Sequence, residues 1–155
     1  MRSLIIFIAT GAYSGFSPIA PGTAGSLVGL LVVWLAFGPL WSHWPLLALA
    51  VFVAAFATSF WIAGRAEVIF EEPDSSKIVL DEVLGMAATM YGNPLTVPWM
   101  LTGFVLFRIF DVMKPFPAGW IDRQVEGGAG VMLDDLASAI YANLLLQVAR
   151  RVLVH

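Results

Sequence analysis

The stretch GGAGVMLDD (residues 127–135) places three glycines and two adjacent carboxylates in front of the nearly all-apolar run 136–142. Glycines followed by a long apolar segment predict a turn and then a helix, here from about residue 130 to residue 151. Carboxylates at the edge of a hydrophobic segment are costly to remove from water. We therefore expect Asp134 and Asp135 to face cations or to share protons.

The composition indicates a membrane protein. Of the 155 residues, 59% are hydrophobic and only 12% are charged, whereas about 25% of a soluble domain is charged. The length predicts a single membrane-embedded domain, residues 1–155. The net charge of −3 argues against a nucleic-acid partner, and the lack of cysteine excludes disulfides and thiolate metal sites. The sequence does not indicate the oligomeric state.

The apolar segments are short and often broken, which predicts an all-α, polytopic fold built from two helical hairpins. The run 3–14 is too short to span a bilayer, so we expect an interfacial or re-entrant helix there. The first hairpin, 27–64, has its first helix stopping at Gly38-Pro39. The second hairpin, 77–113, is broken at residues 92–94, because a proline within one continuous helix would cost about 3 kcal/mol.

Polar residues mark the expected helix starts. The segment 14–26 is rich in glycine, proline and hydroxyl residues and is predicted to be irregular, with Thr23 or Ser26 capping the next helix. The segment Asp74-Ser75-Ser76 is expected to cap a helix that runs to about Tyr91. The acidic run 67–74 is expected to be a solvated loop.

Both hairpins return the polar segments to one side of the membrane. That side carries five cations: Arg65, Lys77, Arg108, Lys114 and Arg123. The positive-inside rule then predicts that it faces the cytoplasm. A fully spanning last helix would put Arg150 and Arg151 on the opposite side, so its orientation stays open.

Five carboxylates are expected to meet on the cytoplasmic side and to hold a divalent metal: Asp81, Glu82, Asp111, Asp134 and Asp135. Magnesium takes oxygen ligands, and repulsion among clustered acids favours a bound cation. Neighbouring residues on a helix point about 100° apart, so each adjacent pair is expected to give one ligand and one outer partner. The alternative is internal salt bridging with Arg108, Lys114 and Arg123.

The cations and the hydroxyl residues are candidate substrate contacts. Arg108, Lys114 and Arg123 are suited to bind phosphate, although arginine and lysine also reach lipid headgroups without any specific role. Gly127 and Gly128 precede a helix, where free backbone N–H groups bind anions. Ser17 and Thr23 can touch substrate, but turn and capping roles explain them equally well.

Several blocks together resemble a known family. They are GFSPIAPGTAGS (15–26), DEVLGM (81–86), FRIFDVMKPFP (107–117), Asp122-Arg123 and residues 127–135. In order and spacing they resemble the signature blocks of the phosphatidylglycerophosphatase A family, over nearly the whole chain. Glu126 departs from the pattern, in which we expect His or Asn.

The resemblance implies a Mg²⁺-dependent lipid phosphatase of the bacterial inner membrane. Such an enzyme would convert phosphatidylglycerophosphate, a lipid phosphomonoester, to phosphatidylglycerol and phosphate. The five carboxylates and Lys114 would then form the catalytic site, with the general base left open. The other hypothesis is a small membrane transporter or ion-binding protein, since broken helices with buried acids also build ion sites. A transporter would place the acids near the bilayer midplane.

Overall fold

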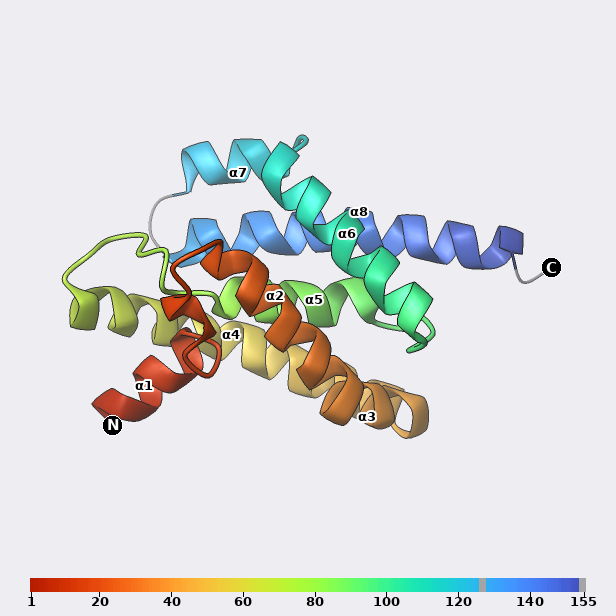
Figure 1. The fold of residues 1–155 in the computed structure, drawn as a ribbon, viewed down its shortest axis with the longest axis horizontal. Coiled ribbons are helices and arrows are strands. Elements are labelled where there is room, and N and C mark those ends of the chain that lie inside the picture. The colour runs from red at the N-terminus through yellow and green to blue at the C-terminus, as the bar shows by residue number, and fades with distance from the viewer. Residues whose placement is uncertain (126–127, 154–155) are drawn as a thin grey trace.

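The computed structural model describes residues 1–125 and 128–153, and these residues are all helical or loop. The helices are α1 (Arg2–Ala9), α2 (Pro21–Val32), α3 (Gly38–His43), α4 (Pro45–Phe70), α5 (Leu80–Met90), α6 (Val97–Met113), α7 (Ala118–Gln124) and α8 (Gly128–Leu153). Two short turns, η1 (Ser14–Phe16) and η2 (Val33–Phe37), complete the order. Figure 1 shows the resulting bundle, which confirms the all-α prediction.

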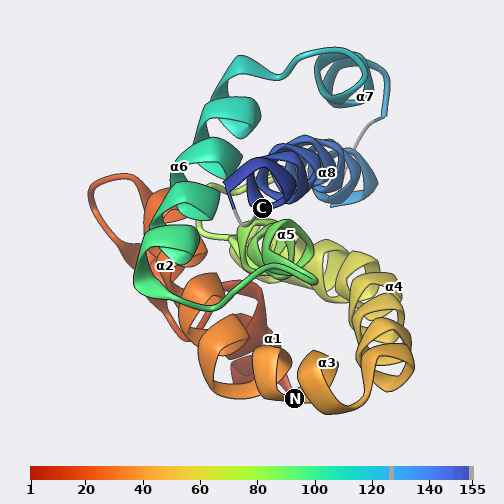
Figure 2. The ribbon, with the colours of Figure 1, turned by 90° about the vertical axis from the view of Figure 1, so that its right-hand side faces the viewer.

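Within the described residues, three helical segments are long and apolar enough to cross a membrane: Pro21–His43, Pro45–Phe70 and Ala129–Leu153. A span needs about 20 residues, so α5 alone is too short. Instead, α5 lies in the middle of the bundle, surrounded by α2, α4, α6 and α8 (Figure 2). The chain is a membrane protein with a short inner helix, and this inner helix carries Asp81 and Glu82.

The first hairpin differs from the prediction at its turn. The helix does not stop at Gly38-Pro39 but continues through α3 to His43, and the chain turns at Trp44. Proline lacks an N–H and its ring pushes away the carbonyl four residues earlier. A wider π-helical turn, η2, directly precedes α3 and accommodates this misfit.

The two predicted N-caps are also wrong. Helix α2 already begins at Pro21, so Thr23 and Ser26 lie inside it, and Ser26 Oγ donates to the Gly22 carbonyl at 2.9 Å. Helix α5 begins only at Leu80, and Ser75 Oγ donates to Glu72 Oε2 at 2.9 Å. The first prediction is wrong because α2 packs closely against α5. Small residues allow such close packing of helices in membranes. A Cβ on Gly29 of α2 would lie 2.8 Å from Met86 Cβ of α5.

The second hairpin, α5 and α6, is broken at residues 91–96 as predicted. The last carbonyls of α5 are bound by a side chain of α8. Asn143 Nδ2 lies 3.1 Å from the Ala88 oxygen, 2.8 Å from that of Thr89 and 2.9 Å from that of Tyr91. Gln147 Nε2 donates to Asn143 Oδ1 at 2.6 Å and holds this amide in place.

We expect Asn143→Leu to lower stability by about 1–3 kcal/mol, because it removes the α8 amide that donates to three partly buried carbonyls. Thermal unfolding followed by tryptophan fluorescence in detergent measures the change. Leu144→Ala is the matched control, since Leu144 is 54% exposed on the same helix. Equal melting temperatures for wild type and Asn143→Leu would contradict this role.

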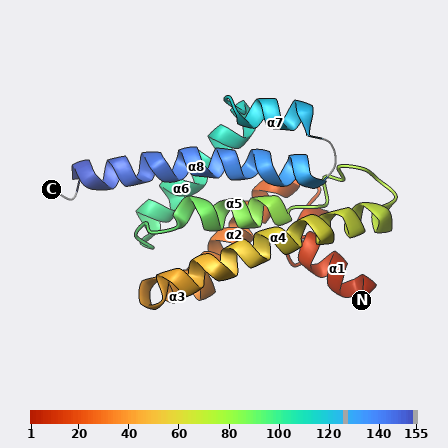
Figure 3. The same cartoon turned by 180° about the vertical axis from the view of Figure 1, so that it is seen from behind.

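Helix α8 runs the length of the bundle (Figure 3). Near its C-terminal end, Arg150 Nη1 donates to the Gly92 carbonyl in the α5–α6 turn at 2.8 Å. The end of α8 is therefore fixed at the end of the bundle opposite to the start of α5.

Candidate active site

The start of α5, the start of α8, the end of α6 and the start of α2 meet at one end of the bundle, on the left in Figure 1. This is the arrangement that the two predicted hairpins require. Each of these helix ends carries residues from one of the motif blocks.

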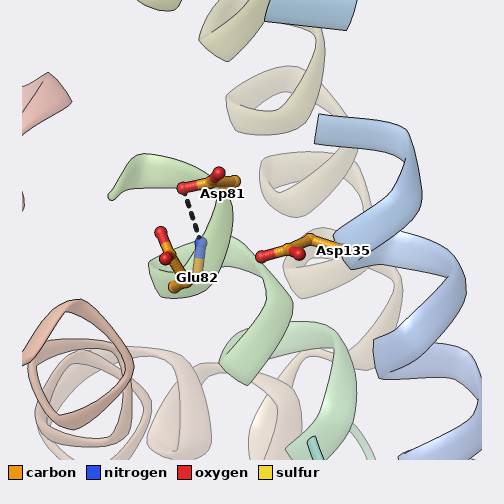
Figure 4. A group of neighbouring side chains, drawn as sticks. All are labelled: Asp81, Glu82 and Asp135. Atoms are coloured by element: carbon orange, nitrogen blue, oxygen red, sulfur yellow. Dashed lines mark hydrogen bonds between the residues drawn. The ribbon is translucent and has the colours of Figure 1, made fainter. Parts of the chain in front are cut away.

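Three carboxylates lie together there: Asp81, Glu82 and Asp135, here called the carboxylate cluster. One oxygen from each lies within 4.8 Å of the others. Asp81 and Glu82 come from α5 and Asp135 from α8, and their side chains converge in Figure 4. Asp81 and Asp135 are only 6% and 5% exposed. Asp81 Oδ1 also accepts a hydrogen bond from the Glu82 N–H at 3.0 Å.

The carboxylate cluster contains buried oxygens without partners. Within the described part of the chain, Glu82 Oε2 and Asp135 Oδ2 are buried and accept no hydrogen bond. Buried acids of like charge repel one another unless a cation or a proton compensates them. Hard divalent cations bind such all-oxygen sets. The carboxylate cluster is therefore a candidate metal site with open ligand positions.

Asp111 and Arg108 border the carboxylate cluster. Arg108 Nη1 lies 2.7 Å from Asp111 Oδ2 and 4.0 Å from Glu82 Oε1. Asp111 also faces Asp135 closely enough to interact with it. The predicted i,i+3 ion pair thus exists, and it places a guanidinium beside the acids.

Asp134 lies outside the carboxylate cluster and pairs with Lys114. The Lys114 Nζ atom is 2.6 Å from Asp134 Oδ2 and also pairs with Asp122 of α7. Lys114 ends α6 in the left-handed conformation (φ +43°), which is unusual for a residue with a Cβ and redirects the chain. Burial alone would lower the pKa of Lys114, but the two carboxylates outweigh it and raise the pKa. Lys114 therefore stays charged at neutral pH and loses its charge only in strongly alkaline solution.

Gly22 of α2 fits against the carboxylate cluster. A Cβ at this position would overlap Glu82 Oε1 and would lie 3.3 Å from Arg108 Nη1. Only glycine leaves room there for both charged groups in their present positions.

A cavity of about 330 Å³ opens beside the carboxylate cluster. Its lining includes Asp81, Glu82 and Arg108, together with Glu67, Asp74 and Ser76. The Asp74 N–H donates to Glu67 Oε1 at 3.3 Å, which ties the α4–α5 loop to α4. The cavity therefore combines carboxylates, one guanidinium and hydroxyl-binding groups.

Comparison with known proteins identifies the family. The family model described as phosphatidylglycerophosphatase A matches residues 7–150. The chain belongs to the phosphatidylglycerophosphatase A family. It is accordingly related to phosphatases that act on lipids. No solved structure matches the chain.

Three curated relatives support membership of this family. A Bacteroides thetaiotaomicron protein, provisionally named a phosphatidylinositol-3-phosphatase, is 37% identical over 97% of this chain and 96% of its own length. Phosphatidylglycerophosphatase A of Escherichia coli K12 is 37% identical over 90% of this chain and 79% of its own. The Haemophilus influenzae Rd protein of the same name is 33% identical over 92% and 86%. The relatives share a lipid phosphatase name but differ in the lipid named.

Several predicted substrate contacts of this family member lie away from the cavity. Ser17 Oγ donates to the Ile19 carbonyl at 2.8 Å, and Arg123 is exposed on α7. Thr23 lies in the first turn of α2 and does not line the cavity. Gly128 begins α8. Gly127 and Glu126 lie outside the described residues.

Sequence reasoning missed other parts of the family site. The role of Gly22 depends on how closely α2 approaches α5 and α6, and the sequence showed it only within a glycine- and proline-rich stretch. Glu67 and Asp74 were predicted only to be solvated; Asp74 is indeed exposed, and both residues also line the cavity. Their position directly ahead of Asp81 and Glu82 was the one available signal.

Proposed function

We propose that residues 1–155 form one domain that hydrolyses phosphatidylglycerophosphate to phosphatidylglycerol and phosphate, using Mg²⁺. The single observation that carries this proposal is the buried carboxylate cluster with open oxygens beside Arg108 at the cavity. Family membership supports lipid phosphatase chemistry, and the two relatives named phosphatidylglycerophosphatase A support the lipid.

The carboxylate cluster offers oxygen ligands, which are the ligands that Mg²⁺ takes. Asp81, Glu82 and Asp135 would hold the ion, with Asp111 as an outer partner next to Asp135. When bound, Mg²⁺ supplies Lewis acidity toward phosphoryl oxygens and lowers the pKa of a coordinated water. One carboxylate of the site would accept the proton of the attacking water.

Arg108 is the phosphate-binding cation in this proposal. It lines the cavity, and arginine binds phosphate oxygens with two parallel hydrogen bonds. Its ion pair with Asp111 orients the guanidinium before substrate arrives. A fixed cation also stabilises the charge that develops on the phosphoryl oxygens in the transition state.

Lys114 is a positioning residue in the same scheme. Its ion pair with Asp134 connects the end of α6 to the start of α8. Because Asp135 follows Asp134 directly, this pair fixes the direction from which Asp135 enters the carboxylate cluster. The Asp135 N–H donates to Asp134 Oδ1 at 2.9 Å, which links the two residues further.

The positions of the charges favour a cytoplasmic active site. Arg108 and Lys114 lie at the same end of the bundle as the carboxylate cluster, and the positive-inside rule assigns such an end to the cytoplasm. The acids lie at the starts of α5 and α8 or near the end of α6, as a headgroup enzyme requires. The transporter hypothesis gains no support from this placement.

A phosphatidylinositol 3-phosphate substrate is the competing assignment, because of the name of the Bacteroides relative. Both lipids carry a phosphomonoester on a hydroxyl-bearing headgroup. Glu67, Asp74 and Ser76 can accept hydrogen bonds from such hydroxyls. The two lipids therefore have to be compared directly on the same protein.

We expect purified protein in mixed micelles to release phosphate from phosphatidylglycerophosphate, to lose this activity in EDTA and to regain it with added Mg²⁺. The magnesium chemistry predicts loss of nearly all turnover without the metal. Phosphatidylinositol 3-phosphate is assayed in parallel. Faster release from the inositol lipid would overturn the substrate assignment, and full activity in EDTA would overturn the metal assignment.

A further inference from the structure

A second hollow lies where α1 meets the last turns of α4. It has a volume of about 340 Å³, and its lining includes Arg2, Ile5, Trp61, Arg65 and Val68. Residues on a helix are rotated by about 100° each, so Arg65 and Glu67 point to opposite faces of α4. Glu67 lines the cavity at the carboxylate cluster, whereas Arg65 lines this hollow. The last turns of α4 thus separate this hollow from the cavity at the carboxylate cluster.

The hollow carries a net positive charge from its side chains. It is lined by the guanidinium groups of Arg2 and Arg65 and by one carboxylate, Glu71. In the part of the chain that the structure describes, neither arginine pairs with an acid, whereas Arg108 and Lys114 both do. Two guanidinium groups that line one hollow with a single carboxylate leave a positive charge that a bound anion can compensate. Arginine is the side chain best suited to bind phosphate oxygens in this way.

The surroundings of the hollow match the boundary of a membrane. Helix α4 is one of the candidate spans, and Arg65 lies near its end at Phe70. Trp61, one turn earlier, is 58% exposed, and Val68 is 70% exposed. Exposed tryptophan is typical of the level of lipid headgroups. Cations beside exposed apolar side chains offer contacts to both the phosphate and the acyl chains of a lipid.

We propose that this hollow binds an anionic phospholipid, with its phosphate between Arg2 and Arg65 and its acyl chains along Trp61 and Val68. Basic pockets between membrane helices bind anionic headgroups in this manner. The lipid would connect α1 to α4, which otherwise meet through the small core of Ile5, Ala9 and Ala66. The site is separate from the carboxylate cluster and does not depend on the proposed reaction.

The test measures lipid binding by native mass spectrometry, with dioleoyl phosphatidylserine, an anionic lipid that is neither substrate nor product of the proposed reaction, titrated against delipidated protein. Dioleoyl phosphatidylcholine and inorganic phosphate serve as the two comparison ligands. We expect Arg65→Gln and Arg2→Gln each to weaken phosphatidylserine binding about five- to tenfold. Arg151→Gln, which removes a cation at the far end of α8, is the matched control and should bind as wild type does.

Each outcome decides the proposal. Weaker phosphatidylserine binding in both Arg2→Gln and Arg65→Gln, with binding by Arg151→Gln unchanged, supports it. If the wild type and both variants bind the anionic lipid equally well, the lipid does not bind in this hollow. Equal binding of phosphatidylcholine overturns the requirement for a net negative lipid. Complete displacement of the bound lipid by millimolar inorganic phosphate would show that the hollow binds free anions, and would overturn the lipid assignment. Should one variant fail to fold, the other decides alone.

Discussion

Asp135→Asn is expected to lower phosphate release by about a thousandfold, because the substitution removes one charge from the carboxylate cluster, which we propose binds the metal. Metal-ion catalysis contributes several kcal/mol, and each 1.36 kcal/mol is a factor of ten in rate. Asparagine keeps the shape of the side chain, so the fold should persist. The measurement is kcat for phosphatidylglycerophosphate at saturating Mg²⁺, with circular dichroism as a check on folding.

Two further variants locate the effect of Asp135→Asn. Glu72→Gln removes an exposed carboxylate that pairs with Lys77, outside the cavity lining, and should leave kcat unchanged. Asp134→Asn breaks the pair with Lys114 and should also impair release, while metal affinity changes less than in Asp135→Asn. Full activity in both Asp134→Asn and Asp135→Asn would refute the assignment of this site.

Gly22→Ala is expected to reduce activity by about 10- to 100-fold, the usual effect of displacing groups around a metal. The new methyl group would overlap Glu82 Oε1 and press toward Arg108. The end of a glutamate side chain can swing away, so we expect the fold to survive while the carboxylate cluster loses its geometry. Activity and the Mg²⁺ concentration for half-maximal activity both report the change.

Gly64→Ala is the matched control for this substitution. Gly64 is also helical, but a Cβ there meets nothing within 4 Å. Alanine favours a helix over glycine by up to about 1 kcal/mol, so this variant should be fully active and slightly more stable. Equal activity of Gly22→Ala and Gly64→Ala would show that the close approach of α2 to Glu82 has no part in the reaction.

The sequence predicted the second hairpin well because its signals are local. The break at residues 91–96 follows from Gly92 and Pro94, and α6 does start beside Pro98, as predicted. The first hairpin was less predictable. Pro39 stays within the helical segment because η2 widens one turn, and nothing in the sequence around Gly38 distinguishes this from a stop.

The carboxylates were predictable as a group because acids are conspicuous in an apolar chain. Which of them meet depends on helix rotation. Asp81 and Glu82 both join the carboxylate cluster, although adjacent residues were expected to diverge. Asp134 pairs instead with Lys114, as an outer partner would. Long-range fits such as Gly22 against Glu82 depend on the packing of α2, and no local pattern reveals them.

The measurement that tests the central claim most directly is Mn²⁺ binding followed by electron paramagnetic resonance. Mn²⁺ is bound by the same oxygen ligands as Mg²⁺. We predict one tight class of sites in the wild type, displaced by Mg²⁺ and lost in Asp81→Asn and in Asp135→Asn, but retained in Glu72→Gln. Unchanged Mn²⁺ binding in both aspartate variants would contradict a metal site formed by Asp81, Glu82 and Asp135.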